Sequence, residues 1–271
     1  MRTFHLAFAS YGRHHPFPGQ GELRAAIHAI TRVARSQLVI FGIAAEQAHV
    51  VVRCERPRAG LLARALLKSL RAVAGPAGLE PARLQPVADA DHLLWLHDYL
   101  VQLPLRTGVS GHPALWEGSP LPDLLGARWV PSYQQQLVAL LPGYQPARAC
   151  KLAGLASLPS PVGPARARLL GIGQIGAAAA AAMAAAPDLQ GRTTPQVLAR
   201  RAAARLASRA GLPPSELSWA FGQTRRTAYR LATAPVPAAA IEALQLRLGL
   251  EQAAAALPTG LALAQLSASP A

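Results

Sequence analysis

Cysteine and lysine are almost absent from this chain of 271 residues, which has two of each. The two cysteines, Cys54 and Cys150, are too few for a disulfide framework, and the sequence has no C-x-x-C pair. We therefore expect a reducing, cytoplasmic setting and no structural zinc.

Long apolar runs are also missing. The first 15 residues, "MRTFHLAFASYGRHH", lack the apolar core of a signal peptide. The most apolar later stretch, Gly176 to Pro187, is mostly alanine and too short to cross a bilayer. We expect no membrane-spanning segment.

Acidic residues are few. The chain has 13 Asp and Glu and 27 Lys and Arg, which gives a formal net charge of +14. The abundance of Arg, Ala, Pro and Gly is typical of a GC-rich genome, so part of this excess reflects composition alone. The first 130 residues carry 14 basic and nine acidic side chains, and the rest carry 13 and four. This positive charge predicts a polyanionic partner, most often nucleic acid. We also expect a nucleoid-associated location in the cytoplasm.

The first part of the chain alternates strand and helix patterns. Strands are predicted over residues 4–10, 37–44 and 48–54, and amphipathic helices over 21–36, 59–75 and 89–104. This order predicts an α+β domain over residues 1–128, with helices packed on a small antiparallel sheet.

The second part is helical. Residues 129–190 are rich in Pro, Gly and Ala and are interpreted as a linker with helical pieces. Residues 191–250 contain several helix patterns and are expected to form an all-α domain, with a C-terminal tail over 251–271.

A helix-turn-helix pattern lies inside the all-α domain. The stretch "PPSELSWAFG" ends at Gly222, and a short basic helix follows over residues 223–232. Arginine reaches phosphates and guanine edges, and hydroxyl groups reach phosphates, so we predict DNA contacts there. The alternative is a packing unit with a solvated basic face. The predicted contacts are Arg225, Arg226, Thr227, Tyr229 and Arg230.

The stretch from Gly171 to Gly176 matches G-x-G-x-x-G, but no strand precedes it and no βαβ unit surrounds it. A dinucleotide site is therefore not expected. We interpret the stretch as a glycine-rich hairpin that leads into the alanine helix, with backbone N–H groups that could face a DNA phosphate.

Two polar side chains interrupt the apolar stretch "QAHVVV". Gln47 and His49 are two residues apart, so they point to the same face of a strand and can both ligate a metal. The alternative is a buried strand histidine beside a spacer glutamine.

The stretch "DYLVQLPLRTGV", residues 98–109, resembles the helix that carries the nucleophilic tyrosine of the REP-associated tyrosine transposases. The matching residues include Asp98, Tyr99, Pro104, Arg106 and Gly108. His49 stands where the last histidine of the family's His–hydrophobic–His motif falls. The resemblance covers residues 1–128 and implies the HUH fold, which is ferredoxin-like.

The resemblance implies covalent chemistry, in which Tyr99 attacks a phosphodiester and forms a 5′-phosphotyrosine link. It also implies Mg²⁺ or Mn²⁺ held by two histidines and a polar residue. This chain departs from the pattern twice, because Gln47 replaces the first histidine and Leu103 replaces the third ligand. Gln102 is the nearest substitute for that ligand. Arg13 and Arg106 are expected to hold the DNA.

Three hypotheses follow. The first is a transposase or single-strand DNA endonuclease that acts on hairpin DNA through Tyr99, with activity attenuated by the altered metal residues. The second is a domesticated, catalytically inactive DNA-binding protein that keeps the fold and has lost the metal. For Tyr99 itself, the alternative is a helix tyrosine that packs against the sheet. The third is a helix-turn-helix transcription regulator. The sequence leaves monomer and homodimer open.

Overall fold

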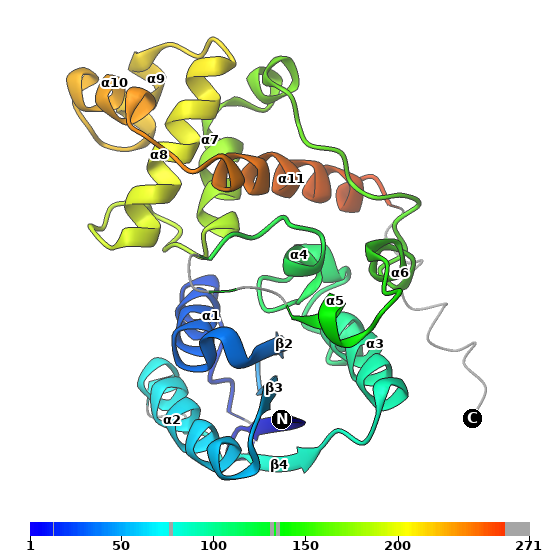
Figure 1. Ribbon diagram of the computed structural model, residues 1–271. Coiled ribbons are helices and arrows are strands. Elements are labelled where there is room, and N and C mark those ends of the chain that lie inside the picture. The colour runs from blue at the N-terminus through cyan, green and yellow to red at the C-terminus, as the bar shows by residue number, and fades with distance from the viewer. Residues whose placement is uncertain (13, 76–77, 131–132, 134–135, 258–271) are drawn as a thin grey trace. The chain divides into compact units, whose positions relative to one another are not determined.

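The computed structural model describes residues 1–12, 14–75, 78–130, 133 and 136–257 (Figure 1). The chain forms two compact units. Unit 1 comprises Met1–Leu124, Pro131–Leu158 and Ala254–Ala271, and unit 2 comprises Leu125–Val130 and Pro159–Ala253.

Unit 1 is built on a four-stranded sheet in the order β2-β3-β1-β4, in which all neighbours are antiparallel. One helix connects β1 to β2 and another connects β3 to β4, so the element order is β-α-β-β-α-β, the ferredoxin-like arrangement. The predicted α+β class with a small antiparallel sheet is confirmed. The elements are β1 Arg2–Ala9, α1 Gln20–Ala34, β2 Leu38–Ile43, β3 Gln47–Cys54, α2 Arg56–Ala74 and β4 Arg83–Pro86.

The two faces of the sheet differ because side chains alternate along a strand. On β1, Phe4, Leu6 and Phe8 are buried and point to the face that α1 and α2 cover. His5 points to the opposite face, where helix α3 (Ala90–Arg106) packs on β2. In Figure 1, α1 and α2 lie on one side of the strands and α3 lies on the opposite side.

The approach of α3 to the sheet depends on Gly42 of β2. A Cβ at this position would lie 3.2 Å from Leu100 Cδ2 and 3.4 Å from Leu103 Cδ2. Gly42 pairs with His49 across the ladder, so α3 crosses the sheet beside His49. Both leucines are buried, and their packing fixes the depth of the helix.

Polar contacts hold the outer side of α3. Asp98 accepts hydrogen bonds from Arg148 Nε (3.1 Å) and His97 Nδ1 (2.8 Å). Because Nδ1 donates, Nε2 of a neutral His97 accepts from the Tyr144 hydroxyl at 2.9 Å. Asp98 thus ties the helix to the segment that contains Arg148. The remaining helices of unit 1 are α4 Leu121–Leu124, α5 Leu137–Leu140 and α6 Pro146–Leu152, with 3₁₀ turns at Arg35–Gln37 and Pro113–Leu115.

A buried ion pair anchors the segment that follows α3. Arg24 of α1 donates to Glu117 at 2.7 Å, and both side chains are almost fully buried. The indole of Trp116 also donates to Ile43 O at 2.6 Å. These bonds attach residues 116–117 to α1 and to the end of β2.

Unit 2 is helical, and alanine dominates its core. Small side chains allow α7 and α8 to pack closely, with buried residues that include Ala178, Ala182, Ala199 and Ala203. The helices are α7 Pro164–Ala182, α8 Thr194–Arg209, α9 Pro214–Ala220, α10 Arg225–Thr233 and α11 Ala238–Ala255.

The glycine-rich stretch 171–176 lies within α7, so the expected hairpin is wrong. Gly171 alone leaves helical geometry, with φ +72°, and kinks the helix there. Glycine adopts this conformation without steric cost, and the next residues resume the helix. Among the described residues, no helix combines the length and apolar character that crossing a bilayer requires.

Candidate functional site

His49 and Tyr99 lie together on the face of the sheet that carries α3. Their ring centroids are 5.5 Å apart and the rings meet edge to face, at 81°. His49 comes from β3 and Tyr99 from the middle of α3, about fifty residues later. The structure therefore brings together the two residues on which the sequence-based hypothesis depends.

His49 is paired with a second histidine, His5 of β1. His5 Nε2 lies 3.0 Å from His49 Nδ1, and the two rings are stacked with centroids 5.2 Å apart. His49 is 7% exposed, and its other nitrogen, Nε2, is buried without a hydrogen-bond partner in the described structure. His5 therefore holds Nδ1 of His49, whereas Nε2 of His49 makes no hydrogen bond to the described residues.

Burial keeps both imidazoles neutral at pH 7. It lowers the pKa of His5 to about 4, with a further lowering from the charge of His92. Burial also lowers the pKa of His49 to about 4, helped by repulsion from His5. A neutral His49 can present either a lone pair or an N–H at Nε2, depending on which histidine donates the shared proton.

One stripe of α3 surrounds Tyr99 with aromatic and polar side chains. The ring of Trp95 stacks on Tyr99 at 5.6 Å and 14°, and His92 lies 6.1 Å from Trp95. On the C-terminal side, the Arg106 guanidinium lies 5.7 Å from the Tyr99 ring centroid. Arg106 also donates to Gln102 Oε1 at 3.1 Å. These residues recur every three or four positions, which places them on one helix face.

A cavity of about 230 Å³ opens beside His49 on the same face of the sheet. Gln47, His49 and Arg83 line it, and Glu80 adds a carboxylate. Arg83 lies on β4, whose four residues are all exposed. A ligand in this cavity would thus meet His49, one arginine and one carboxylate.

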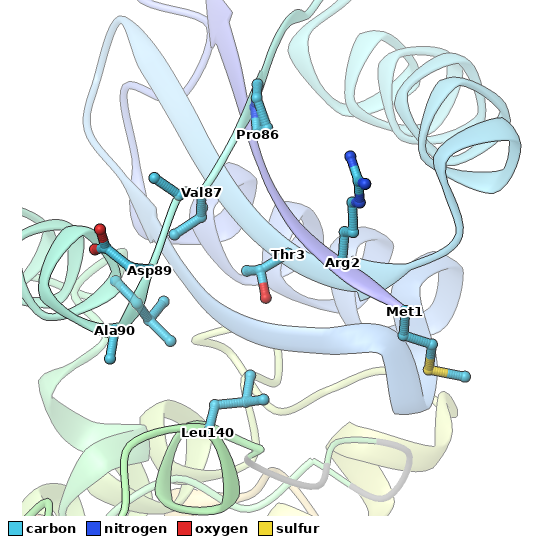
Figure 2. Close-up of a pocket in the computed structure, with 10 residues that line it drawn as sticks. Met1, Arg2, Thr3, Pro86, Val87, Asp89, Ala90 and Leu140 are labelled. Carbon is cyan, nitrogen blue, oxygen red and sulfur yellow. The ribbon is translucent and has the colours of Figure 1, made fainter.

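Two larger cavities in unit 1 contain none of the predicted site residues. One of about 440 Å³ lies between the start of β1 and the start of α3, and Figure 2 shows Thr3, Asp89 and Leu140 around it. The other, about 420 Å³, is lined by α1 and α2 and includes Arg32 and Lys68. Neither gathers polar groups around Tyr99.

The residues predicted to hold a metal are only partly assembled. Gln47 and His49 both line the cavity of about 230 Å³. The oxygen of Gln102 instead accepts a bond from Arg106, and Leu103 is buried against the sheet. Among the described residues, no three His, Cys, Asp or Glu side chains gather where a metal ion could bind.

The residues predicted to bind DNA fall in separate places. Arg13 lies outside the described residues, and Arg106 is exposed beside Tyr99. The others lie on α10, where Ala228 and Ala232 face the core. Exposed on α10 are Arg225, Arg226, Tyr229 and Arg230, while Thr227 is half-buried and donates its backbone N–H to the Thr224 cap.

His5 and Trp95 were not among the site residues predicted from the sequence. His5 interrupts an apolar strand, and only the register of β1 against β3 brings it beside His49. Trp95 precedes Tyr99 by four residues, a spacing that predicts contact between aromatic rings on a helix. That spacing could have identified Trp95 from the sequence.

Comparisons with known proteins give one similar structure. No protein-family model matches the chain, and no curated protein matches it. A solved structure of a REP-associated tyrosine transposase bound to a REP hairpin is similar over 44% of this chain and 75% of its own, at 15% identity. The TM-score is 0.37, and the proposed function rests on the residues of this chain.

Proposed function

We propose that the chain is a transposase-like DNA-binding protein that acts on hairpin or single-stranded DNA at the α3-bearing face of the sheet, through Tyr99. The observation that carries this proposal is the 5.5 Å approach of the Tyr99 ring to His49. A half-exposed phenol beside a buried imidazole with a free nitrogen is an arrangement suited to nucleophilic attack.

The proposed step exchanges one phosphoester bond for another. The Tyr99 oxygen attacks phosphorus, a 5′-phosphotyrosine bond forms, and the bond to the 3′ oxygen breaks. The phenolic proton leaves Tyr99, and the departing 3′ oxygen takes up a proton to become a hydroxyl. Attack by a 3′ hydroxyl on the phosphotyrosine reverses the step and joins strands.

His49 is the proposed acceptor of the phenolic proton. If His49 Nδ1–H donates to His5 Nε2, the lone pair of His49 Nε2 is available to a base-catalysed step. The low pKa of His49, about 4, makes it a weak base in the free protein. A bound phosphodiester would raise that pKa, because its negative charge stabilises the imidazolium.

Arg106 is the proposed phosphate contact. Its guanidinium is exposed and lies over the Tyr99 ring, 5.7 Å from the ring centroid, so a phosphate that approaches Tyr99 would lie near a positive charge. Arginine pairs with phosphate through two parallel N–H groups and keeps its charge at all relevant pH values.

The described residues do not form a complete Mg²⁺ or Mn²⁺ site. Gln47 and His49 supply two donors, whereas Leu103 cannot ligate and Gln102 is bonded to Arg106. Mg²⁺ demands six ligands in near-octahedral geometry and would have to take the rest from water and phosphate. A divalent ion stays a prediction, and no step above depends on it.

A second candidate function is DNA binding without cleavage. The burial of Leu103 at the third-ligand position favours it, since this side chain packs on Gly42 and is 1% exposed. In that case Tyr99 serves only as a packing and DNA-contact residue.

One experiment separates the two functions. A 5′-labelled and a 3′-labelled hairpin oligonucleotide with single-stranded flanks are incubated with the protein in Mn²⁺, Mg²⁺ or EDTA. Cleavage through Tyr99 gives a denaturation-resistant adduct that Tyr99→Phe abolishes while hairpin affinity is kept. Equal binding by both proteins with no adduct in any buffer supports the second function.

The exposed face of α10 is proposed as a second DNA contact, to duplex. The turn between α9 and α10 and the three exposed arginines of α10 fit a helix-turn-helix reader, in which the second helix enters the major groove. The arginines would contact phosphates or guanine edges.

A further inference from the structure

Trp95 is an exposed tryptophan in a fixed position next to the proposed nucleophile. Its side chain is 60% exposed on α3, a large apolar surface to leave in water. The ring is stacked on Tyr99 at 5.6 Å, and His92 lies against it at 6.1 Å. The indole is therefore held on the helix while much of its surface faces solvent.

The neighbours of Trp95 combine aromatic and basic groups. One helical turn toward the C-terminus is Tyr99, and beyond it the Arg106 guanidinium lies over the Tyr99 ring. Asp91 is an exposed carboxylate near the start of the helix, while the carboxylate of Asp98 is occupied by Arg148 and His97. An aromatic pair with an arginine beside it is the composition of surfaces that bind single strands.

We propose that the indole of Trp95 is a stacking platform for an unpaired nucleobase that neighbours the phosphodiester at Tyr99. The base would continue the stack of Trp95 on Tyr99. Trp95 and Tyr99 are one helical turn apart, about 5.4 Å along the axis, so a base on Trp95 belongs to a nucleotide close to the one whose phosphate meets the phenol. The ligand class, single-stranded DNA, rests on the proposed function.

Base stacking on an aromatic side chain is tolerant of sequence, because every base has a π face. Trp95 would therefore set the position of the strand rather than its sequence. This role differs from cleavage, since Trp95 has no group that reacts with phosphate. Trp95 is a binding residue, and its replacement should lower the affinity for single-stranded DNA whether or not Tyr99 reacts.

The platform also has a rigid support. Tyr99 is braced by His49 on the sheet, with ring centroids 5.5 Å apart, and Trp95 is braced by Tyr99. A preorganised ring loses little conformational freedom when a base stacks on it. Replacing Tyr99 by phenylalanine keeps the ring and removes only the hydroxyl, so it should leave the platform in place.

The test uses the full chain and short single-stranded oligonucleotides with 2-aminopurine at successive positions. Stacking on indole quenches 2-aminopurine fluorescence, so one position should show strong quenching with the native protein. Trp95→Ala should abolish the quenching and weaken binding about tenfold, within the range measured for loss of one stacked base. Trp95→Phe should restore part of both. Unchanged quenching and affinity in Trp95→Ala would overturn the proposal.

Trp219 provides the matched control, because it is 85% exposed and lies on α9 in unit 2. Trp219→Ala removes the same indole and should change neither quenching nor single-strand affinity. Loss of quenching in this variant, with Trp95→Ala unaffected, assigns the stacked base to unit 2 and overturns the proposal.

The adduct assay and the quenching assay together separate this proposal from the proposed cleavage, and Tyr99→Phe is the variant that should form no adduct. Quenching that depends on Trp95 without any adduct in the native protein supports the platform and contradicts cleavage. An adduct that forms through Tyr99 without any Trp95-dependent quenching supports cleavage and contradicts the platform.

Discussion

His5 Nε2 lies 3.0 Å from His49 Nδ1, which ties the imidazole next to Tyr99 to the neighbouring strand. The pair forms because β1 and β3 are antiparallel, with Ala7 opposite His49 and His5 opposite Val51. The two imidazoles are thus diagonal neighbours on one face of the sheet. His5 contacts the imidazole of His49, so its proposed role is to position His49.

Replacing His5 by leucine should lower the rate of adduct formation by about 10- to 100-fold, the loss found when a partner that orients a metal-ligating histidine is removed. His5→Gln should recover much of the rate, because its amide oxygen can accept from His49 Nδ1. Single-turnover rates measured over a pH series check this. Equal rates in all three proteins would show that the pair has no positioning role.

Acid should destabilise the metal-free protein between pH 6.5 and 4. Burial lowers the pKa of both His5 and His49 from 6.5 to about 4, so the unfolded chain binds more protons in this window. The free energy of unfolding therefore rises with pH from about 4 to about 6.5 and then levels off. Thermal melting in EDTA measures it, and His5→Gln should show a shallower dependence than the native protein. Identical pH profiles would contradict this assignment.

Gly42→Ala should lift α3 from the sheet. The added Cβ would lie 3.2 Å from Leu100 Cδ2 in a packed interface, so side chains or helix must shift. We expect a loss of about 1–3 kcal/mol in the free energy of unfolding and a larger fractional loss of adduct formation. Gly60→Ala on α2 is the control, since nothing lies within 4 Å of its added Cβ. A similar response in both variants would argue against this interface as the determinant of Tyr99 position.

Arg225→Ala combined with Arg226→Ala should weaken duplex binding and reduce its salt dependence. For each phosphate that the protein no longer neutralises, the slope of log K against log salt should fall by about 1. The control removes two other exposed arginines of unit 2, through Arg192→Ala with Arg209→Ala, at the same change in charge. If both double variants lose affinity equally, the basic charge of the unit acts without a specific face.

Much of unit 1 could be predicted from the sequence, because period-two apolar segments and amphipathic helices follow each other in a recognisable order. The approach of Tyr99 to His49 was expected from the family resemblance and not from the composition or periodicity of the chain. The diagonal pairing of His5 with His49 could not be predicted, because it depends on the strand register. The hairpin expected at Gly171 was wrong because a glycine with positive φ serves as well for a kink inside a helix as for a hairpin.

The most direct test is peptide mapping by mass spectrometry after reaction with a hairpin oligonucleotide that has single-stranded flanks. We expect a nucleotide adduct on the peptide that contains Tyr99, absent from Tyr99→Phe. An adduct on a different residue, or none under any metal condition while the hairpin is bound, would contradict a nucleophilic role for Tyr99.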